Sequence, residues 1–285
     1  MKKIAFLTCE RFQRLTSSDQ LVADYLERKE ISCEPVVWND PAINWDQFDL
    51  LLVRSVWDYH LLFEEWVAFL QKLMEHKRKV LNPIDVLLWN SDKRYLQEIL
   101  GDQKQVPFQI FEQGSEIDLK ALMSTASWEK LVVKPTVSAS GFKTWSCHIS
   151  EATAKQEEFE LLLKERDLIV QEFAPEVVEQ GEWSLVFFDK VFSHAVLKRV
   201  KVGEFRVQSD YGGTSEKGEA PSSAIQTAQD ILDGIPSPIC YARVDGIMRD
   251  GAFYLMELEL IEPELFVDQV RGSEKAFGAA ILKAL

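Results

Sequence analysis

The chain of 285 residues has only four cysteines, and they are scattered. Cys9, Cys33, Cys147 and Cys240 form no Cys-x-x-Cys pair. Their spacing therefore argues against a zinc site and against a disulfide framework. It favours small buried thiols in a reducing compartment.

Long apolar runs are also missing. No stretch approaches the roughly 20 apolar residues that a membrane helix needs. The first residues, MKKIAFLTCERF, become polar too early for a signal peptide. We therefore expect no membrane partner and a cytoplasmic location.

Positive charge is in short supply. Lysine and arginine number 32 against 46 aspartates and glutamates, which gives a formal net charge of −14. Nucleic-acid binding depends on clustered cations, so this balance argues against a nucleic-acid partner. It leaves ATP open as a ligand, because ATP phosphates need only a few local cations and a metal ion.

Histidine offers no pattern that suggests chemistry. The four histidines are His60, His76, His148 and His194, and their spacing fits neither a catalytic triad nor a metal site. We expect each of them to be incidental to function.

The first third of the chain alternates strand and helix patterns. Short apolar runs at 3–8, 34–38, 48–53 and 79–82 are interleaved with amphipathic helical patterns at 19–29 and 64–76. The run FDLLLV at 48–53 is apolar except for Asp49, as in a parallel strand buried on both faces. This pattern predicts an α/β domain with a parallel sheet.

Further along, the pattern changes. The polar stretch 101–104 precedes Pro107 and is a reasonable domain boundary. A helix is expected over 91–100, with Ser91 as its N-cap. After Pro107 we expect strands at 108–111, 131–134 and 168–173 and an antiparallel pair at 184–188 and 193–198. Helices are expected at 118–123, 153–166, 224–232 and 274–285.

Two charged residues follow the apolar run 48–53. Arg54 and Asp58 stand at the carboxyl end of this strand. Ligands of open α/β sheets bind beyond the carboxyl ends of the strands, so both residues are candidates for binding a substrate. The alternative is an Arg54–Asp58 pair on the surface.

Residues 241–263 concentrate acids in a hairpin. The Asp-Gly turn at 250–251 separates two apolar strands, so Asp245 is expected near Glu257 and Glu259. The two glutamates alternate with leucines and share one face. Three converging carboxylates suit a hard divalent cation such as Mg²⁺. The alternative is a strand whose acids simply face water.

A loop of small residues follows the strand that ends at Lys134. Its sequence, PTVSASG over 135–141, would let backbone N–H groups approach phosphate oxygens closely. It is not a Walker A sequence, because the lysine precedes the small residues. An ordinary turn is the alternative reading.

In their order and spacing, these features resemble those of the ATP-grasp superfamily. The order is Lys93 near a helix start, Lys134 before the small-residue loop, the strand end at 171–173, two later cations, and the acidic hairpin. The chain is most similar to the glutathione-synthetase-like and RimK-like carboxylate–amine ligases, in particular to the branch with the cyclo-ligase of cycloserine biosynthesis. The resemblance spans nearly the whole chain.

The resemblance implies a fold of the α/β plus α+β class. An N-terminal α/β domain with a parallel sheet would occupy residues 1–88, and an ATP-grasp module would occupy 89–285. Within the module, a small lid would cover about 106–172 and a C-terminal α+β domain would follow. ATP would be held between the last two parts.

The resemblance also implies roles for individual residues. The ATP phosphates would be reached by Lys93 and Lys134 and covered by the loop residues Ser138, Ser140 and Gly141. Adenine would be held by Gln171, Glu172 and Phe173, and the ribose by Glu179 or Glu182. Lys198 and Arg206 would lie near the γ-phosphate and the acyl phosphate, and Asp245, Glu257 and Glu259 would bind two Mg²⁺ ions, replaceable by Mn²⁺. Gly212 and Gly213 are expected beside the substrate.

One motif departs from the family pattern. The metal-binding strand of the family usually reads Glu-x-Asn, whereas this chain has Glu257-Leu258-Glu259. Glutamate keeps an oxygen ligand and adds negative charge. Pro263 lies one residue later than usual, which leaves the role of Glu262 open.

The function that follows is an ATP- and Mg²⁺-dependent ligase, which joins a carboxylate to an amine through an acyl phosphate and releases ADP. Cations and metal ions would stabilise the charge of phosphoryl transfer, and a lid would exclude water. A small-molecule kinase and a non-catalytic nucleotide-binding module are the alternatives. Small molecules or short peptides are the expected partners, and a homo-oligomer stays open.

Overall fold

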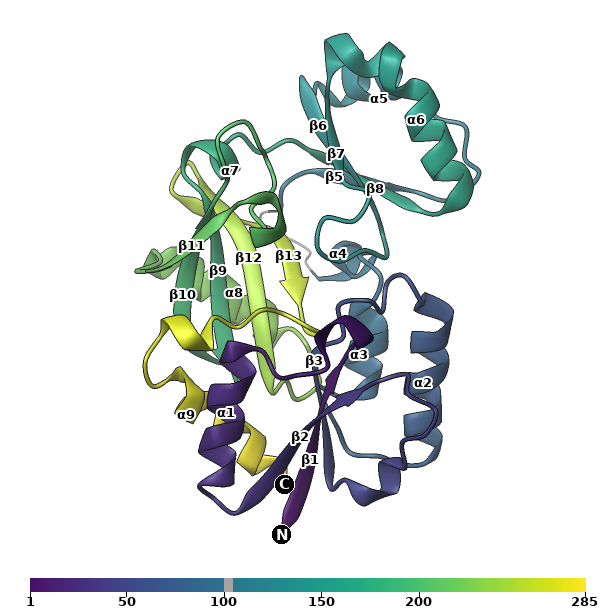
Figure 1. Cartoon of the computed structure of the whole chain (residues 1–285). Coiled ribbons are helices and arrows are strands. Elements are labelled where there is room, and N and C mark those ends of the chain that lie inside the picture. The colour runs from purple at the N-terminus through teal and green to yellow at the C-terminus, as the bar shows by residue number, and fades with distance from the viewer. Residues whose placement is uncertain (100–104) are drawn as a thin grey trace.

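The computed structural model describes residues 1–99 and 105–285. Its described strands form three sheets, one parallel and two antiparallel, with helices packed beside them (Figure 1). This confirms the expected α/β plus α+β class. The boundary expected at 101–104 lies outside the described residues. Within the described ranges, no helix combines the length and the apolar character needed to cross a bilayer.

The first sheet is parallel, with the order β2 (Ile31–Val37), β1 (Lys2–Thr8), β3 (Leu50–Ser55), β4 (Val80–Leu81). All six residues of β3 are buried; the apolar residues 50–53 predict this for the first four, and Arg54 and Ser55 are buried as well. The helices that belong to this region are α1 (Ser17–Glu27), α2 (Phe63–Glu75) and α3 (Ile84–Asn90), with short 3₁₀ turns at Glu10–Phe12 and Trp45–Gln47.

The second sheet is antiparallel, with the order β5 (Phe108–Phe111), β8 (Leu168–Glu172), β6 (Lys130–Pro135), β7 (Trp145–His148). It packs against α5 (Leu119–Ala126) and α6 (Ala152–Glu165), and a 3₁₀ turn at Ile149–Glu151 leads into α6. In place of the single helix expected over 91–100, the described part of this stretch holds only α4 (Tyr95–Glu98). The preceding helix α3 starts directly after Pro83, a residue that favours a helix start.

The third sheet is antiparallel, with the order β11 (Thr214–Gly218), β10 (Val191–Arg199), β9 (Glu182–Phe188), β12 (Tyr241–Arg249), β13 (Ala252–Glu259). The turn between β12 and β13 has positive φ at Asp250 and Gly251, which confirms the hairpin predicted from that pair. The remaining elements are α7 (Glu176–Glu179), α8 (Ser222–Asp233), α9 (Ser273–Lys283) and 3₁₀ turns at Ser209–Tyr211 and Val267–Gln269. The three sheets fall within 2–81, 108–172 and 182–259. The division at residue 88 and the lid at about 106–172 stay predictions.

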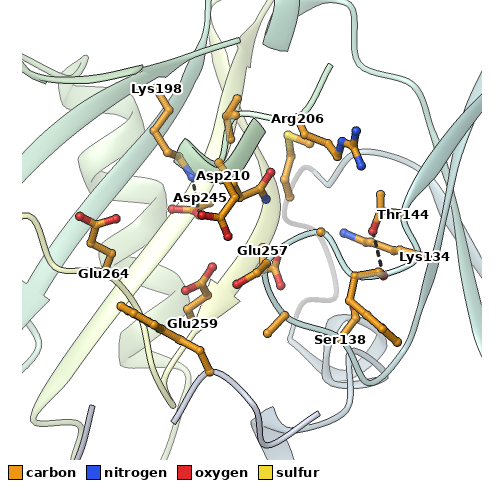
Figure 2. Close-up of a pocket in the computed structure, with 18 of the residues that line it drawn as sticks. Lys134, Ser138, Thr144, Lys198, Arg206, Asp210, Asp245, Glu257, Glu259 and Glu264 are labelled. Atoms are coloured by element: carbon orange, nitrogen blue, oxygen red, sulfur yellow. Dashed lines mark hydrogen bonds and ion pairs between the residues drawn. The ribbon is translucent and has the colours of Figure 1, made fainter. Parts of the chain in front are cut away.

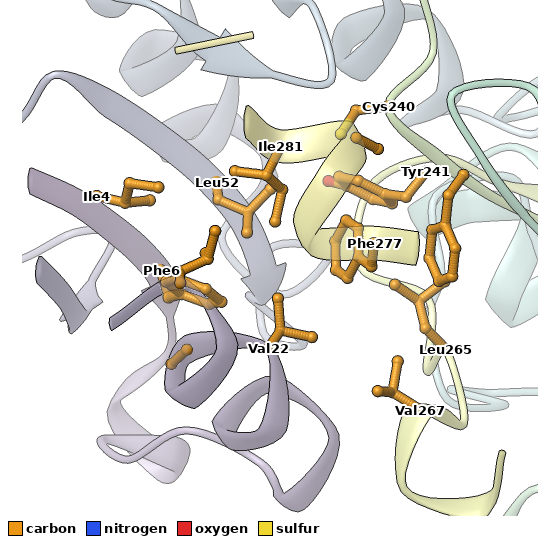
Figure 3. Packing of buried hydrophobic residues seen from close by; sticks show 14 of the residues in the cluster. Ile4, Phe6, Val22, Leu52, Cys240, Tyr241, Leu265, Val267, Phe277 and Ile281 are labelled. Atoms are coloured by element: carbon orange, nitrogen blue, oxygen red, sulfur yellow. The ribbon is translucent and has the colours of Figure 1, made fainter. Parts of the chain in front are cut away.

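The first and third sheets share one apolar core. Phe6 and Leu52 of the parallel sheet, Val22 of α1, Phe277 of α9 and Tyr241 of β12 belong to the same buried cluster (Figure 3). The rings of Phe277 and Phe188 stack with centroids 4.7 Å apart. Because α1 and α9 pack against each other between the sheets, the two regions bury their apolar faces together (Figure 1).

A buried asparagine crosses the same junction. Asn82, fully buried after β4, donates to the carbonyls of Tyr241 and Leu260 at 2.9 Å each. Its own side-chain oxygen accepts from the backbone N–H of Cys240 at 2.7 Å. One side chain thus satisfies backbone groups of both chain segments at the open end of the β12–β13 hairpin.

We predict that Asn82→Ala destabilises the fold by about 3 kcal/mol, since it leaves several buried backbone groups unpaired. Thermal unfolding of the variant and the parent measures the loss. Asn39→Ala, at an exposed position, is the matched control and should change the unfolding midpoint little. Equal midpoints for the two variants would show that the Asn82 contacts are not stabilising.

Candidate functional site

A cavity of about 570 Å³ opens where the three sheets meet. Most of the site residues expected from the sequence line it, from loops and strands of all three regions (Figure 2). They are Asp58, Lys93, Lys134, Ser138, Ser140, Gly141, Gln171, Glu172, Phe173, Glu182, Lys198, Arg206, Gly213, Asp245, Glu257 and Glu259. Arg54, Glu179 and Gly212 are not part of the lining.

The acidic hairpin brings its carboxylates together as the sequence predicts. Asp245 on β12 pairs in register with Glu257 on β13, and Arg243 pairs with Glu259. Burial alone would raise the pKa of Asp245, but the charges of Arg243 and Lys198 outweigh it and hold that pKa below its usual range. Asp245 therefore stays ionised in the cavity wall.

Two other acids are less well compensated. Burial raises the pKa of Glu259 to about 7, and repulsion from Asp245 adds to it although Arg243 opposes the shift. Burial and the neighbouring Glu259 raise the pKa of Glu262 to about 8. This side of the cavity is therefore short of positive charge.

The donor set at the hairpin fits Mg²⁺ in its chemistry. Among residues 1–99 and 105–285, no three acidic, histidine or cysteine side chains are gathered closely enough to hold an ion as they stand. The carboxylates of the hairpin are instead held by cations: Asp245 and Glu259 form ion pairs with Arg243, and Glu257 forms one with Lys93. Oxygen donors and excess negative charge are what a hard divalent cation requires.

Lys93 connects the acidic hairpin to the small-residue loop. Its Nζ lies 2.9 Å from Oε1 of Glu257 and donates to the carbonyl of Ser138 at 2.6 Å. Burial works against the charged form, but Glu257 overcomes it and raises the pKa of Lys93. A buried lysine thus remains cationic because it faces a carboxylate.

Lys134, unlike Lys93, has no carboxylate partner among the described residues. Within the described part of the chain, no hydrogen bond or ion pair engages its ammonium group. Burial lowers the pKa of Lys134, although Glu257 acts in the other direction. A half-buried cation without a partner in a cavity wall is a place for an anionic ligand.

Lys198 has two carboxylate partners. Its Nζ lies 2.9 Å from Asp245 (Figure 2). The same Nζ also pairs with Glu182. Between the two glutamates proposed for the ribose, only Glu182 lines the cavity, whereas Glu179 is exposed in α7. The structure therefore brings Glu182, and not Glu179, to the site.

The strand end at 171–173 forms another wall of the cavity. The Glu172 carboxylate is engaged by Arg249 at 3.0 Å, outside the hairpin of acids. The Phe173 ring lies under the Lys130 ammonium, 3.8 Å from its centroid, and near the ring of Phe205. The Glu172 side chain is occupied, and the backbone N–H groups of Glu172 and Phe173 already donate to the carbonyls of Pro107 and Lys130 at 2.8 and 3.0 Å.

Arg54 does not take the place expected of it. It is 3% exposed, pairs with Asp19 at 2.7 Å, and donates to the carbonyl of Pro263 at 2.9 Å. Its guanidinium packs over the ring of Tyr241. Arg54 thus fixes the chain just after β13, while Asp58, bonded by Trp38 at 2.8 Å, faces the cavity.

Of the two glycines at 212–213, only one lines the cavity. Gly213 lines the cavity, and a Cβ there would lie 2.1 Å from the carbonyl oxygen of Val207. Only glycine permits this close backbone approach. Gly212 instead packs against Lys201 with positive φ.

Sequence reasoning missed two functional candidates. His60 is buried in the cavity wall, its Nδ1 has no partner in the described chain, and its ring faces Phe142 with centroids 5.1 Å apart. Burial lowers the pKa of His60 to about 4. No spacing signal marks this histidine. Arg243 did have one, because it stands two residues before Asp245 and so shares its strand face.

Comparisons with known proteins show which proteins the chain resembles. A family model described as the N-terminal domain of D-cycloserine synthetase DcsG matches residues 4–82. The cycloserine biosynthesis protein DcsG of Streptomyces lavendulae is 27% identical over 274 residues, covering 90% of this chain and 89% of that protein.

Solved structures show the same fold. The crystal structure of D-cycloserine synthetase DcsG has a TM-score of 0.88 at 23% identity, with 99% of each chain covered. D-alanine–D-alanine ligase of Bacillus anthracis with ATP has a TM-score of 0.69 at 14% identity, covering 100% of this chain and 96% of that one. The ATP-grasp ligase PsnB with its minimal precursor, Mg and ADP has a TM-score of 0.65 at 13% identity, covering 99% and 97%.

The buried state of His60 predicts a pH effect on stability. Its folded pKa lies below the unfolded value of about 6.5, so its neutral form stabilises the fold above that pH. This contribution is lost as the pH falls from about 6.5 towards 4. In His60→Gln, the drop in unfolding free energy between pH 7 and pH 5 should be smaller by about 1 kcal/mol, with solvent screening allowed for.

Urea unfolding of parent and variant at both pH values gives this difference of differences. Carboxylates elsewhere titrate equally in both proteins and cancel. An identical pH dependence in the two proteins would mean that the His60 ring is well hydrated.

Proposed function

We propose that this chain is an ADP-forming ATP-grasp ligase related to D-cycloserine synthetase. In its cavity, a substrate carboxylate would be activated as an acyl phosphate. An amine or similar nucleophile then attacks the activated carbon, and phosphate leaves. The chain spans nearly the full length of the relatives that it matches, so the comparison covers the whole site.

One observation supports this proposal above the others. Lys134, a cation without a partner among the described residues, and the acids of the β12–β13 hairpin line the same cavity (Figure 2). A triphosphate with its metal ions complements both, since phosphate oxygens meet the lysine and the metal meets the carboxylates. Lys93, already held against Ser138, would contact the same phosphates beside the loop.

The small-residue loop can shield the reaction from water. Ser138, Ser140 and Gly141 line the cavity, and positive φ at Ser140 and Gly141 bends the backbone there. An acyl phosphate is hydrolysed readily, so a covering loop protects it until the nucleophile attacks.

The other end of the cavity suits the nucleoside. The strand end at 171–173 lines the cavity and would hold adenine through backbone carbonyls, with the Phe173 ring beside it, because the Glu172 side chain and the N–H groups of residues 172 and 173 are already bonded. Glu182 is favoured over Glu179 for the ribose because it alone of the two lines the cavity.

For the metal, we propose Asp245, Glu257 and Glu259 as ligands of two Mg²⁺ ions, which Mn²⁺ would replace. When bound, these ions neutralise charge that develops on the transferred phosphoryl group. Lys198 holds Asp245 in place from the other side, at 2.9 Å. Together with Arg206 it would supply positive charge near the acyl phosphate.

The substrates are proposed to be small molecules or short peptides with a free carboxylate. The cavity wall between Asp58, His60 and Gly213 has room beside the phosphate region and carries polar groups for the acceptor. Arg54 is not proposed as a substrate contact, because its guanidinium is committed to Asp19 and Pro263.

The reaction class can be tested by trapping. In a screen of amino acids and short peptides for ADP release, any active substrate should yield a hydroxamate when hydroxylamine is added, because an acyl phosphate reacts with it. A colorimetric iron assay detects the product. A kinase of a small molecule would release ADP without hydroxamate, and a non-catalytic module would release neither.

The role of Lys134 predicts a selective defect. Lys134→Met should raise the KM for ATP about 30-fold, the value of one lost charge-assisted hydrogen bond to phosphate. Steady-state ADP release at varied ATP measures the shift. Lys120→Met, on the exposed face of α5, is the matched control and should stay within about twofold of the parent. Similar KM values for both variants would count against phosphate binding by Lys134.

A further inference from the structure

The segment that carries Arg206 is held in a defined shape by one glutamate. Glu204 accepts two hydrogen bonds from the Arg206 guanidinium, from Nε at 3.1 Å and from Nη2 at 2.7 Å. The same carboxylate accepts the backbone N–H groups of Phe205 at 2.8 Å and of Arg206 at 3.2 Å. Glu204 thus orders both the side chain and the turn that bears it.

A tyrosine supports Arg206 from a second side. The Cζ of Arg206 lies 3.5 Å from the ring centroid of Tyr211, in cation–π geometry. The Tyr211 hydroxyl donates to the Gly141 carbonyl at 3.5 Å, and a Cβ on Gly141 would lie 3.0 Å from the Tyr211 ring. The arginine is therefore placed directly against the loop proposed to cover the phosphates.

Glu204 itself stays outside the cavity lining, whereas Arg206 is part of it. The pair takes up Nε and Nη2 and leaves Nη1 outside it. The hydrogen bonds from Arg206 lower the pKa of Glu204 to about 2, so the carboxylate remains charged at neutral pH. A charged, four-fold hydrogen-bonded carboxylate fixes the guanidinium plane more strongly than water would.

We propose that Glu204 is a positioning residue for the reaction: it orients Arg206 so that the Nη1 edge of the guanidinium, which Glu204 does not engage, meets the transferred phosphoryl group. This inference rests on the proposed function. Glu204 and Arg206 lie two residues apart in one turn, so a movement of the segment carries both together and does not separate them. The pair consequently works as a preformed unit, and its geometry is fixed before substrate arrives.

The test is a double-mutant cycle on Glu204 and Arg206. Glu204→Gln should lower kcat for hydroxamate formation about 10- to 100-fold, the cost of a misplaced charged group, and leave the KM for ATP within about twofold. In an Arg206→Ala background, Glu204→Gln should have almost no further effect. Glu204→Asp, which keeps the charge, should recover part of the lost rate.

A purely structural role gives a different result. It would lower the unfolding midpoint and would slow the reaction equally in both backgrounds, which overturns the proposal. A kcat unchanged or increased in Glu204→Gln overturns it too, the increase showing that the ion pair restrains Arg206. Glu216→Gln, which removes a carboxylate from an exposed pair with Arg199 at 3.8 Å, is the matched control and should behave as the parent.

A binding measurement separates this inference from the proposed function. If the parent yields no hydroxamate with any substrate, the proposed function fails, and the same cycle is then read by calorimetry with ADP and a non-hydrolysable ATP analogue in Mg²⁺. Glu204→Gln should lower the ratio of the affinity for the ATP analogue to that for ADP at least fivefold. It should do so only when Arg206 is present. An unchanged preference overturns the positioning role. If Glu204→Gln does not fold, Tyr211→Leu, which removes the other support of Arg206, replaces it in the cycle.

Discussion

The site depends on one ion pair, between the buried Lys93 and the half-buried Glu257. This contact joins the start of the region after α3 to the last strand of the third sheet, and through the Ser138 carbonyl it also holds the small-residue loop. Lys93 is buried and Glu257 is half-buried, and the opposite charge shifts the pKa of each group towards the ionised form against the effect of burial. The pair is thus what keeps both groups charged where a ligand must find them.

The two sides of the cavity around that pair differ in charge, with excess acids on one side and Lys134 on the other. Burial raises the pKa of Glu259 and Glu262 on one side and lowers that of Lys134 on the other. Each shift means that a group lacks enough opposite charge nearby. A metal–triphosphate complex carries both signs in one ligand, and so it relieves both imbalances at once. A ligand of a single sign would relieve one and worsen the other.

The sequence predicted what is local and missed what is long-range. The acidic hairpin was predictable because strand alternation and an Asp-Gly turn specify which residues face each other. Arg54 was misplaced because its partner, Asp19, lies in α1, and position at a strand end says nothing about which helix covers it. His60 carried no pattern at all. The choice of Glu182 over Glu179 required knowing that the chain turns between them, at the end of α7.

The shared core has a consequence for the order of assembly. Phe277 and Ile281 of α9 fill the space beside Phe6 and Val22, so the first region of the chain cannot bury its apolar face by itself. During synthesis this apolar face stays uncovered until α9 has been made, after every described strand of the three sheets. Nascent chains of this protein therefore expose an incomplete apolar surface until α9 has been made, and such a surface promotes aggregation.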